Sequence, residues 1–342
     1  MDDAPDTAAL TDFCDEVFDD RRTIVVERMA GGGSCEVFAV DRGDEHMVLR
    51  RAPQRANASR AHDVLREYRI LDAIAAEPVR IPRPIAACDD PTVFGSPFFL
   101  MERIDGAPIR SNVPAAWAAA SDTHGAAVID LLDALVEVHT VDWQRCGLGD
   151  LAHDPGYLGR QIDRWLSQLA SYDGRELPEA AIVADWLRPR VPVEQLQTLC
   201  HGDYKLDNAM FSLDLPPRLL AVVDWEMASI GDPLIDLCWM LVFHPTDEGL
   251  MPLGTASDPR LDPASVPSVA AIIDRYAERT GRDVSAIDWY HVFSRWKMAI
   301  VLEGGFAKFQ KGLSNNPHHA YFGAQTDRLL ASAIDLIAAE EH

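Results

Sequence analysis

The stretch LCHGDYKLDNAMF, residues 199–211, places a carboxylate, a lysine and a carboxamide within six positions, between apolar residues. These groups belong to Asp203, Lys205 and Asn208. Sixteen residues after Asn208, a second apolar run ends abruptly in the carboxylate of Asp224. A segment with a purely structural role gains little from such polar groups, so both motifs are candidates for chemistry.

The spacing of these groups matches what phosphoryl transfer from ATP requires. One carboxylate must accept or orient the proton of an attacking hydroxyl, while a carboxamide and a second carboxylate hold Mg²⁺ against the triphosphate. The pattern therefore predicts ATP and Mg as cofactors, with Asp203 as the catalytic base and Asn208 and Asp224 as metal ligands. Lys205 lies between them, where its ammonium could meet the charge of the transferred phosphoryl group.

Length and charge narrow the class of protein further. A chain of 342 residues fits two lobes or domains with substantial cores. A net charge of −23 repels nucleic acid and anionic membranes, so we expect neither as a partner. Such a field could attract a cationic substrate, although strongly acidic surfaces more often serve solubility.

The six cysteines lie far apart, with no CxxC pair and no Cys/His cluster at zinc spacing, which predicts reduced and mostly buried thiols. The N-terminal MDDAPDTAAL lacks the apolar core of a signal peptide. No apolar run approaches the roughly 18 residues of a membrane helix. These features together predict a cytoplasmic protein.

The residue pattern in the first third of the sequence predicts mainly strands. Residues 23–52 contain β-branched and aromatic segments separated by turn signals, which indicate two or three antiparallel strands. Helical periodicity occurs at 7–20 and 59–76. The proline-rich segment 77–91 is expected to be a loop, and 96–106 a buried strand that ends in a glycine turn.

From about residue 114 onward helical patterns dominate, and only 199–224 interrupts them with short strands and loops. The predicted helices are 114–140, 155–172, 178–188, 232–243, 265–280, 286–312 and 321–340. The sequence therefore predicts an α+β fold, with a small β-rich N-terminal lobe at 1–103 and a large, mainly helical C-terminal lobe at 104–342.

These motifs together resemble one family. HGDYKLDN at 201–208 and DWEMASIGDPLIDL at 224–237 are similar to the aminoglycoside-phosphotransferase-like (APH) family, relatives of the protein kinases. With VLRRAP and LREYRIL, they most resemble the phosphotransferase domains that occur alone in bacteria or fused to acyl-CoA dehydrogenases. The resemblance covers roughly residues 8–335. It implies a bilobal protein-kinase-like fold and ATP-dependent phosphorylation of a hydroxyl group.

The resemblance also assigns the phosphate-binding segment. GGGSCEVF lies where the family has its phosphate-covering hairpin, so the backbone of Gly31, Gly32, Gly33 and Ser34 is a candidate contact to ATP. The glycine run by itself fits a tight turn equally well. Arg50 occupies the position of the kinase lysine, and its planar fork suits two phosphate oxygens.

Three further assignments follow from the same resemblance. Glu67 matches the glutamate that pairs with this cation, although a solvated acid on a helix face is the alternative. The backbone near Glu102, Arg103 and Ile104 matches the hinge that binds adenine. Arg51 is next to the arginine at the kinase lysine's position and should point to the opposite face of the strand.

Two residues are expected to support the catalytic loop. In the family, the residue that matches Asp236 braces this loop from the helix behind it. We expect His201 to be structural and not a base, because the carboxylate of Asp203 has that task.

The acceptor is expected to be a small molecule. Protein kinases place a long activation segment after the metal-binding aspartate, and this segment forms the platform for a peptide. Here only DWEMASIGDPLID separates Asp224 from Asp236. Such a platform does not fit in so short a segment.

The predicted helix at 286–312 is a candidate wall of the acceptor site. Lys297, Lys308 and Lys311 concentrate positive charge there, although a solvated helix end also explains them. Facing the cleft, they would suit an anionic acceptor such as a hydroxyacyl-CoA-type metabolite, towards which the resemblance to the dehydrogenase-linked domains also points.

Two alternatives stay open. An aminoglycoside or macrolide phosphotransferase would show clustered acids, and the segment after residue 244 has some, although it fits a polar surface loop equally well. A nucleotide-binding pseudokinase regulator would be expected to lack one of Asp203, Asn208 and Asp224, and all three are present.

Overall fold

The computed structural model describes residues 7–29, 35–53, 64–109, 113–118, 120, 122–194, 196–245 and 261–340. Its N-terminal part is built on a five-stranded antiparallel sheet with the strand order β1-β2-β3-β5-β4. The strands are β1 (Val25–Arg28), β2 (Glu36–Arg42), β3 (Glu45–Arg51), β4 (Pro84–Cys88) and β5 (Phe98–Glu102).

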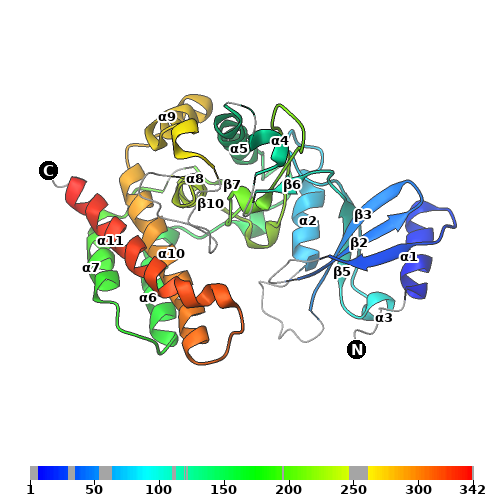
Figure 1. Ribbon diagram of the computed structural model, residues 1–342, viewed down its shortest axis with the longest axis horizontal. Coiled ribbons are helices and arrows are strands. Elements are labelled where there is room, and N and C mark those ends of the chain that lie inside the picture. The colour runs from blue at the N-terminus through cyan, green and yellow to red at the C-terminus, as the bar shows by residue number, and fades with distance from the viewer. Residues whose placement is uncertain are drawn as a thin grey trace.

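Alternating side chains of this sheet enter two different cores, as the period of two along a strand requires. Leu49 and Leu100 pack in a cluster with Leu10 of α1 (Ala8–Phe18) and Phe94 of α3 (Pro91–Phe94). Their neighbours Val48, Phe99 and Met101 join the main core, together with Ile70 and Leu71 of α2 (Val64–Ile74). The sheet is thus covered on both faces, and Figure 1 shows α2 on the side of the helical lobe.

The prediction for residues 77–91 was wrong. We expected a loop, and the structure contains the edge strand β4 there, while the short helix α3 begins at the last residue of the segment. Pro84 is the first residue of β4, and proline is tolerated at the start of an edge strand because its missing N–H is not needed there. Prolines therefore masked the strand pattern.

The larger part of the chain is mainly helical (Figure 1). Its helices are α4 (Ala115–Ala118), α5 (Thr123–His139), α6 (Tyr157–Ser171), α7 (Pro178–Leu187), α8 (Pro233–Val242), α9 (Val269–Thr280), α10 (Ile287–Gln310) and α11 (Phe322–Glu340). Short 3-10 helices are η2 (Gly149–Leu151), η3 (Arg188–Arg190), η4 (Leu206–Asn208), η5 (Trp225–Met227), η6 (Pro263–Ser265) and η7 (Pro317–Tyr321).

Two small sheets carry the segment at 199–224. The strand β6 (Ala107–Pro108) pairs with β8 (Ala209–Phe211), which pairs with β9 (Leu219–Val222), and β7 (Thr198–Cys200) pairs with β10 (Ser229–Gly231). This confirms the predicted short strands and loops between helices. The expected single helix at 114–140 is instead divided into α4 and α5, and Asp122 before α5 has a φ of 70°.

The predicted α+β, bilobal fold is confirmed. The expected boundary between residues 103 and 104 falls in the connection from β5 to β6 and stays a prediction. Among the described residues, no helix is both long and apolar enough to cross a membrane. All six cysteines are free, and five of them are buried.

Candidate active site

The side chain of Asp203 lies in the loop between β7 and η4, and three other side chains donate hydrogen bonds to its carboxylate. Lys205 Nζ is 2.6 Å from Oδ2 and 2.8 Å from Oδ1, and Trp239 Nε1 is 2.9 Å from Oδ1. Asn208 Nδ2 is 3.0 Å from Oδ2. The structure thus brings together the predicted base, the predicted lysine and one predicted metal ligand.

The loop that carries Asp203 is fixed from behind by the buried Asp236 of α8. Its two carboxylate oxygens accept hydrogen bonds from the backbone N–H groups of His201, at 2.5 Å, and Gly202, at 2.8 Å. Gly202 has a φ of 85°, and a Cβ there would collide with the Met227 carbonyl oxygen. The local backbone therefore requires glycine, and Asp236 braces the loop as the resemblance implied.

The ring of His201 is fully buried and holds the loop against β9. Its Nε2–H donates to the Val223 carbonyl oxygen at 3.0 Å, and its Nδ1 accepts from the Asp203 N–H at 3.3 Å. These contacts are those of an anchor for the loop backbone.

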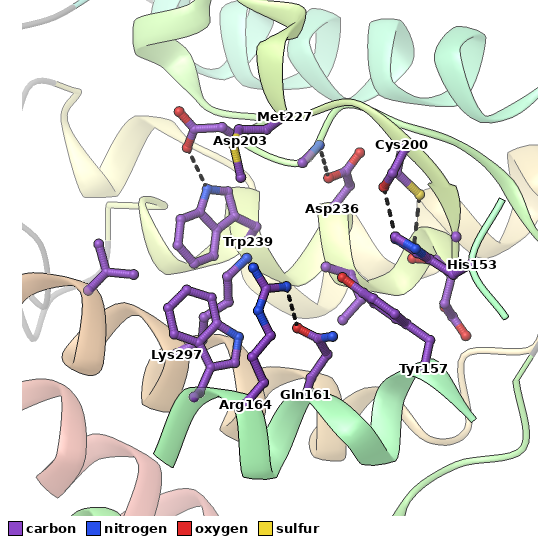
Figure 2. Close-up of a pocket in the computed structure, with 17 residues that line it drawn as sticks. His153, Tyr157, Gln161, Arg164, Cys200, Asp203, Met227, Asp236, Trp239 and Lys297 are labelled. Carbon is purple, nitrogen blue, oxygen red and sulfur yellow. Dashed lines mark hydrogen bonds between the residues drawn. The ribbon is translucent and has the colours of Figure 1, made fainter. Parts of the chain in front are cut away.

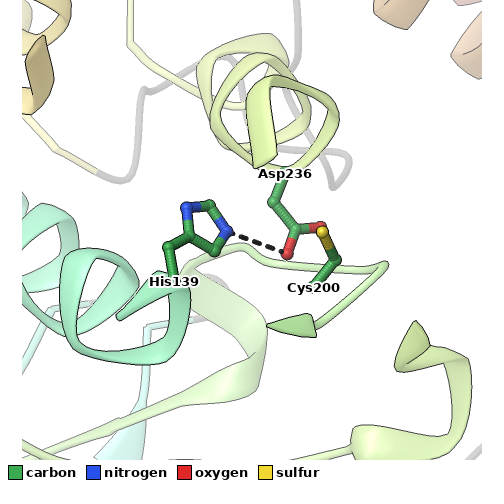
Figure 3. Close-up of side chains that lie close together, drawn as sticks. All are labelled: His139, Cys200 and Asp236. Atoms are coloured by element: carbon green, nitrogen blue, oxygen red, sulfur yellow. Dashed lines mark ion pairs between the residues drawn. The ribbon is translucent and has the colours of Figure 1, made fainter. Parts of the chain in front are cut away.

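Behind the loop, His139, Cys200 and Asp236 lie close enough for a metal site, but their chemistry argues against one (Figure 3). His139 Nε2 is 3.5 Å from Asp236 Oδ2, and its Nδ1 is bonded to Tyr276 Oη at 2.8 Å. Burial raises the pKa of the Cys200 thiol well above its usual range, which disfavours the thiolate that metals need. Burial also acts to raise the pKa of Asp236, but hydrogen bonding and charge from His139 hold it below the ordinary value. The cluster is a structural brace.

Asp224 connects the helical lobe to the sheet of the other lobe. It follows β9 with a φ of 72°, and its Oδ1 accepts a hydrogen bond from Arg50 Nη2 of β3 at 2.8 Å. Arg50 Nε lies 3.2 Å from Glu67 Oε2 of α2, so the expected ion pair is present. Burial raises the pKa of Glu67 to about 7, against the lowering effect of Arg50. Arg51 points away and pairs with Glu36 at 2.8 Å, as strand alternation requires.

The two predicted metal ligands lie on adjacent backbone. The Asn208 carbonyl oxygen accepts the N–H of Val223 at 2.9 Å, directly before Asp224. Asn208 Nδ2 donates to the Asp203 carbonyl at 2.8 Å, which fixes the amide and directs its Nδ2 away from a cation. The side-chain oxygen of Asn208 and the carboxylate of Asp224 form an all-oxygen donor set, which is the set that Mg²⁺ prefers. The residues present therefore fit magnesium.

The remaining nucleotide-binding predictions concern the glycine segment and the hinge. Gly31, Gly32, Gly33 and Ser34 lie outside the described residues. At the predicted hinge, the N–H of Glu102 donates to the Arg83 carbonyl at 2.9 Å.

The next hinge residue is also bonded within the sheet region. The N–H of Arg103 donates to the His46 carbonyl at 3.1 Å, and its side chain pairs with Asp41 at 3.0 Å. The N–H groups of both hinge residues are therefore engaged within the protein, and the Ile104 carbonyl oxygen accepts the N–H of Gly106 at 3.0 Å.

A pocket of about 250 Å³ opens beside Asp203 between α6, α8 and α10 (Figure 2). Its lining includes Tyr157, Gln161, Arg164 and Trp165 of α6, Trp239 of α8, and Lys297 and Val301 of α10. Sequence reasoning missed the residues from α6 and α8. For Trp239 a signal existed, because it follows Asp236 by three positions and thus shares its side of a helix.

The structure separates the three lysines of the predicted acceptor wall. Lys297 lines the pocket, with Nζ 4.2 Å from the ring centre of Trp239. Burial lowers the pKa of Lys297 to about 8. Lys308 and Lys311 are exposed at the far end of α10, and Lys311 Nζ is 2.8 Å from the Tyr172 carbonyl oxygen. Of the acids after residue 244, Asp262 forms a turn at η6, and Asp247, Glu248 and Asp258 lie outside the described residues.

Comparison with known proteins agrees with this geometry. The family model described as the phosphotransferase enzyme family (APH) matches residues 25–284. A crystal structure of a putative aminoglycoside phosphotransferase from Ralstonia eutropha superposes with a TM-score of 0.82 at 28% identity, over 97% of this chain and 99% of that one.

Two relatives are named for different activities. Acyl-CoA dehydrogenase family member 11 of Rattus norvegicus is 26% identical over 92% of this chain and 40% of its own length. Viomycin phosphotransferase of Streptomyces vinaceus is 27% identical over 62% of this chain and 75% of its own length. The chain thus spans less than half the length of the dehydrogenase relative that it matches.

Proposed function

The chain belongs to the APH phosphotransferase family, and from this membership we propose that it transfers the γ-phosphoryl group of ATP to a hydroxyl group of a small molecule. One observation carries the proposal. The carboxylate of Asp203 lines a pocket on one side, while Asn208, which would hold the metal, is bonded to the same carboxylate. A hydroxyl in the pocket would therefore meet the base beside the phosphate-binding groups.

In this reaction Asp203 takes the proton of the acceptor hydroxyl at a carboxylate oxygen. Its orientation is already set by Trp239 and Asn208, so little rearrangement is needed when the acceptor binds. Lys205 offsets the charge of the carboxylate and would meet the charge of the transferred phosphoryl group.

Asn208 and Asp224 would hold Mg²⁺, which supplies positive charge to the phosphate oxygens when bound. Arg50 would contact the phosphates from the opposite lobe, because its guanidinium already reaches Asp224. Glu67 holds the other edge of this guanidinium and keeps it directed at the site. Glu102, Arg103 and Ile104 would bind adenine through their backbone, and Gly31, Gly32, Gly33 and Ser34 would cover the phosphates.

One candidate acceptor is a hydroxyacyl-CoA-type metabolite. Two features support it. The name of the dehydrogenase relative contains acyl-CoA, and two lysines on one side of α10 lead away from the pocket. Lys297 at the pocket and Lys308 at the exposed end lie eleven residues apart, or roughly 16 Å along the helix. Because eleven residues complete about three turns, the two lysines share one side of the helix. A CoA moiety extending from the pocket could place its phosphates near Lys308.

An antibiotic acceptor is the second candidate, because a viomycin phosphotransferase and a putative aminoglycoside phosphotransferase are among the relatives. The positive charge of Lys297 in the pocket disfavours a cationic antibiotic.

The test is ADP release in the presence of Mg²⁺ over a panel of hydroxyacyl-CoA thioesters, macrolides and cationic antibiotics. We expect release that depends on the acceptor, with the phosphorylated product identified by mass spectrometry. Tight binding of ATP and magnesium without turnover of any compound would favour the pseudokinase alternative.

A further inference from the structure

The pocket beside Asp203 contains a lysine without a carboxylate partner. Within the described residues no carboxylate lies within 4.0 Å of Lys297 Nζ, which lies 4.2 Å from the ring centre of Trp239 and 5.7 Å from that of Trp165. Lys205 and Lys311, in contrast, each pair with an aspartate. Lys297 is thus a half-buried ammonium that rests on aromatic rings and has no carboxylate of the described part of the chain in direct contact, so its N–H groups can bond a ligand.

A second cation lies beside it. Arg164 of α6 lines the same pocket, and its Nη1 donates to the neutral side-chain oxygen of Gln161 at 3.3 Å. In Figure 2 the heads of Arg164 and Lys297 both point into the pocket. Each also lies 5.7 Å from the ring centre of Trp165. Two like charges repel each other, and this arrangement is stabilised when an anion binds between them.

The acids of the pocket wall are already engaged. Asp236 accepts the N–H groups of His201 and Gly202, and Asp232 accepts the Tyr290 hydroxyl at 2.7 Å. Asp203 is paired with Lys205. The oxygens of these acids are thus occupied within the protein, and the charged groups of the described lining that can donate hydrogen bonds to a ligand anion are Lys297 and Arg164.

We propose that Lys297 and Arg164 form an anion-binding subsite, and that the acceptor carries a carboxylate or phosphate group close to its reacting hydroxyl. The proposal rests on the phosphotransferase function above and narrows the class of its acceptor. Trp239 links the two parts of the site, because its Nε1–H donates to Asp203 while its ring faces Lys297. One indole ring thus separates the base from the ammonium.

The short separation of Lys297 from Asp203 distinguishes this subsite from a site that would extend along α10 to Lys308. The phosphates of CoA lie a full pantetheine arm away from an acyl hydroxyl, which is too far for Lys297 and Asp203 to hold both groups. A compact hydroxy acid or hydroxyalkyl phosphate places its anion and its hydroxyl within the pocket itself.

The first experiment compares matched acceptors. Linear hydroxycarboxylates from glycolate to 6-hydroxyhexanoate are assayed against their primary amides, and against the corresponding hydroxyalkyl phosphates. We expect kcat/KM to favour at least one anion over its neutral analogue by about tenfold or more, mainly through KM. In Lys297→Met the ratio should fall towards one while turnover of the amide persists, and Lys311→Met should keep the wild-type ratio. Equal use of acids and amides, a preference for cationic antibiotics, or an unchanged ratio in Lys297→Met would overturn the proposal.

A second experiment needs no turnover. The chain has four lysines, so acetylation of each can be followed by mass spectrometry. We expect the preferred hydroxycarboxylate or hydroxyalkyl phosphate to slow acetylation of Lys297, with Lys311 as the internal reference. Protection by ATP and magnesium alone would reassign Lys297 to the donor phosphates, and protection by none of these compounds would refute the subsite. If protection occurs without any phosphorylation, the subsite stands and the proposed reaction fails.

Discussion

The carboxylate of Asp203 is held by Lys205, Asn208 and Trp239. Because all three donate to its two oxygens, they fix the plane of the carboxylate. The position of the proposed base is thus determined before an acceptor binds. Single substitutions at these positions should therefore have distinct effects on turnover and on ATP binding.

Replacing Asp203 by asparagine should abolish transfer while leaving nucleotide binding nearly intact. The amide has the same shape but cannot accept the proton, and loss of a general base typically costs about 10²–10⁴-fold in rate. Turnover with the identified acceptor and calorimetric titration with ATP measure the two effects, with Asp214→Asn in a nearby exposed loop as the control. A variant that retains more than about a third of wild-type turnover would exclude Asp203 as the base.

Replacing Asp224 by alanine should weaken magnesium-dependent binding of ATP far more than Asp203→Asn does. The substitution removes the charged oxygen ligand that we assign to the metal. It also removes a partner of Arg50, so Asp224→Asn, which retains an oxygen, is the matched comparison. Calorimetry with and without Mg²⁺ separates the two contributions. Equal ATP affinity in Asp224→Ala and wild type would exclude the metal role.

Acceptor recognition should depend on pH through Lys297, whose pKa is lowered to about 8 by burial. The facing charges are Asp203 and Asp236, which favour the ammonium, and Arg164 and Lys205, which oppose it. Since the proton is lost as pH rises through this value, KM for an anionic acceptor should increase above pH 8. KM for the neutral amide should not follow, and in Lys297→Met the two acceptors should show the same profile. Parallel profiles in the wild type would contradict the assignment.

At the scale of elements, α10 shows what a sequence pattern can and cannot predict. Its apolar residues Trp289, Phe293 and Trp296 are buried in the core, and the predicted helix itself is confirmed. Lys297 and Lys308 lie on one side of the helix, yet only the first meets α6 and α8 at the pocket. Which lysine is enclosed depends on where the neighbouring helices end, and periodicity along one helix contains no such information.

The active-site loop was more accessible to prediction than the pocket. Asp203, Asn208 and Asp224 are close in sequence or end a strand, so spacing alone indicated a common site. Arg164 belongs to α6, which precedes this loop in the sequence, and it joins the site through packing of α6 against α10. The strand β4 was missed for a similar reason, since its first residue, Pro84, is tolerated because the strand lies at the edge of the sheet.

If the acceptor is a CoA thioester, Lys308 should contribute to its binding. Reversal by Lys308→Glu should raise KM for the thioester and spare KM for ATP. An exposed charge contact is worth about 1 kcal/mol, which corresponds to roughly fivefold, and the effect should shrink in high salt. Lys311→Glu should be weaker, because Lys311 is bonded to the Tyr172 carbonyl oxygen and Asp173. Steady-state kinetics at two salt concentrations measure this effect. If Lys308→Glu leaves KM for the thioester unchanged, Lys308 is an ordinary solvated residue at the helix end.

At the scale of the whole molecule, the two lobes are joined by contacts from α2 and β3 to one short segment after β9. Arg66 donates to the carbonyl oxygens of Glu226 and Ala228, and Glu67 accepts the N–H of Trp225 at 3.1 Å. Arg50 of β3 adds its ion pair with Asp224. The segment that contains the proposed metal ligand is therefore held in place by the other lobe, so the position of the small lobe should affect binding of the nucleotide.

Arg66 offers a test of this coupling, because it is neither among the residues that line the pocket nor one of the proposed metal ligands. Arg66→Met removes two charge-assisted hydrogen bonds to backbone carbonyls, each worth about 1.5–3 kcal/mol when intact. We expect ATP affinity in the presence of Mg²⁺ to fall by roughly tenfold or more, and the thermal shift produced by ATP to decrease. Arg69→Met is the matched control, since Arg69 also reaches from α2 to the helical lobe, but in an exposed pair with Asp150. Such pairs contribute about 0–1 kcal/mol, so this control should bind ATP almost as the wild type does. If both variants bind ATP equally well, the lobes are not coupled through this segment, and nucleotide binding depends on the local ligands alone.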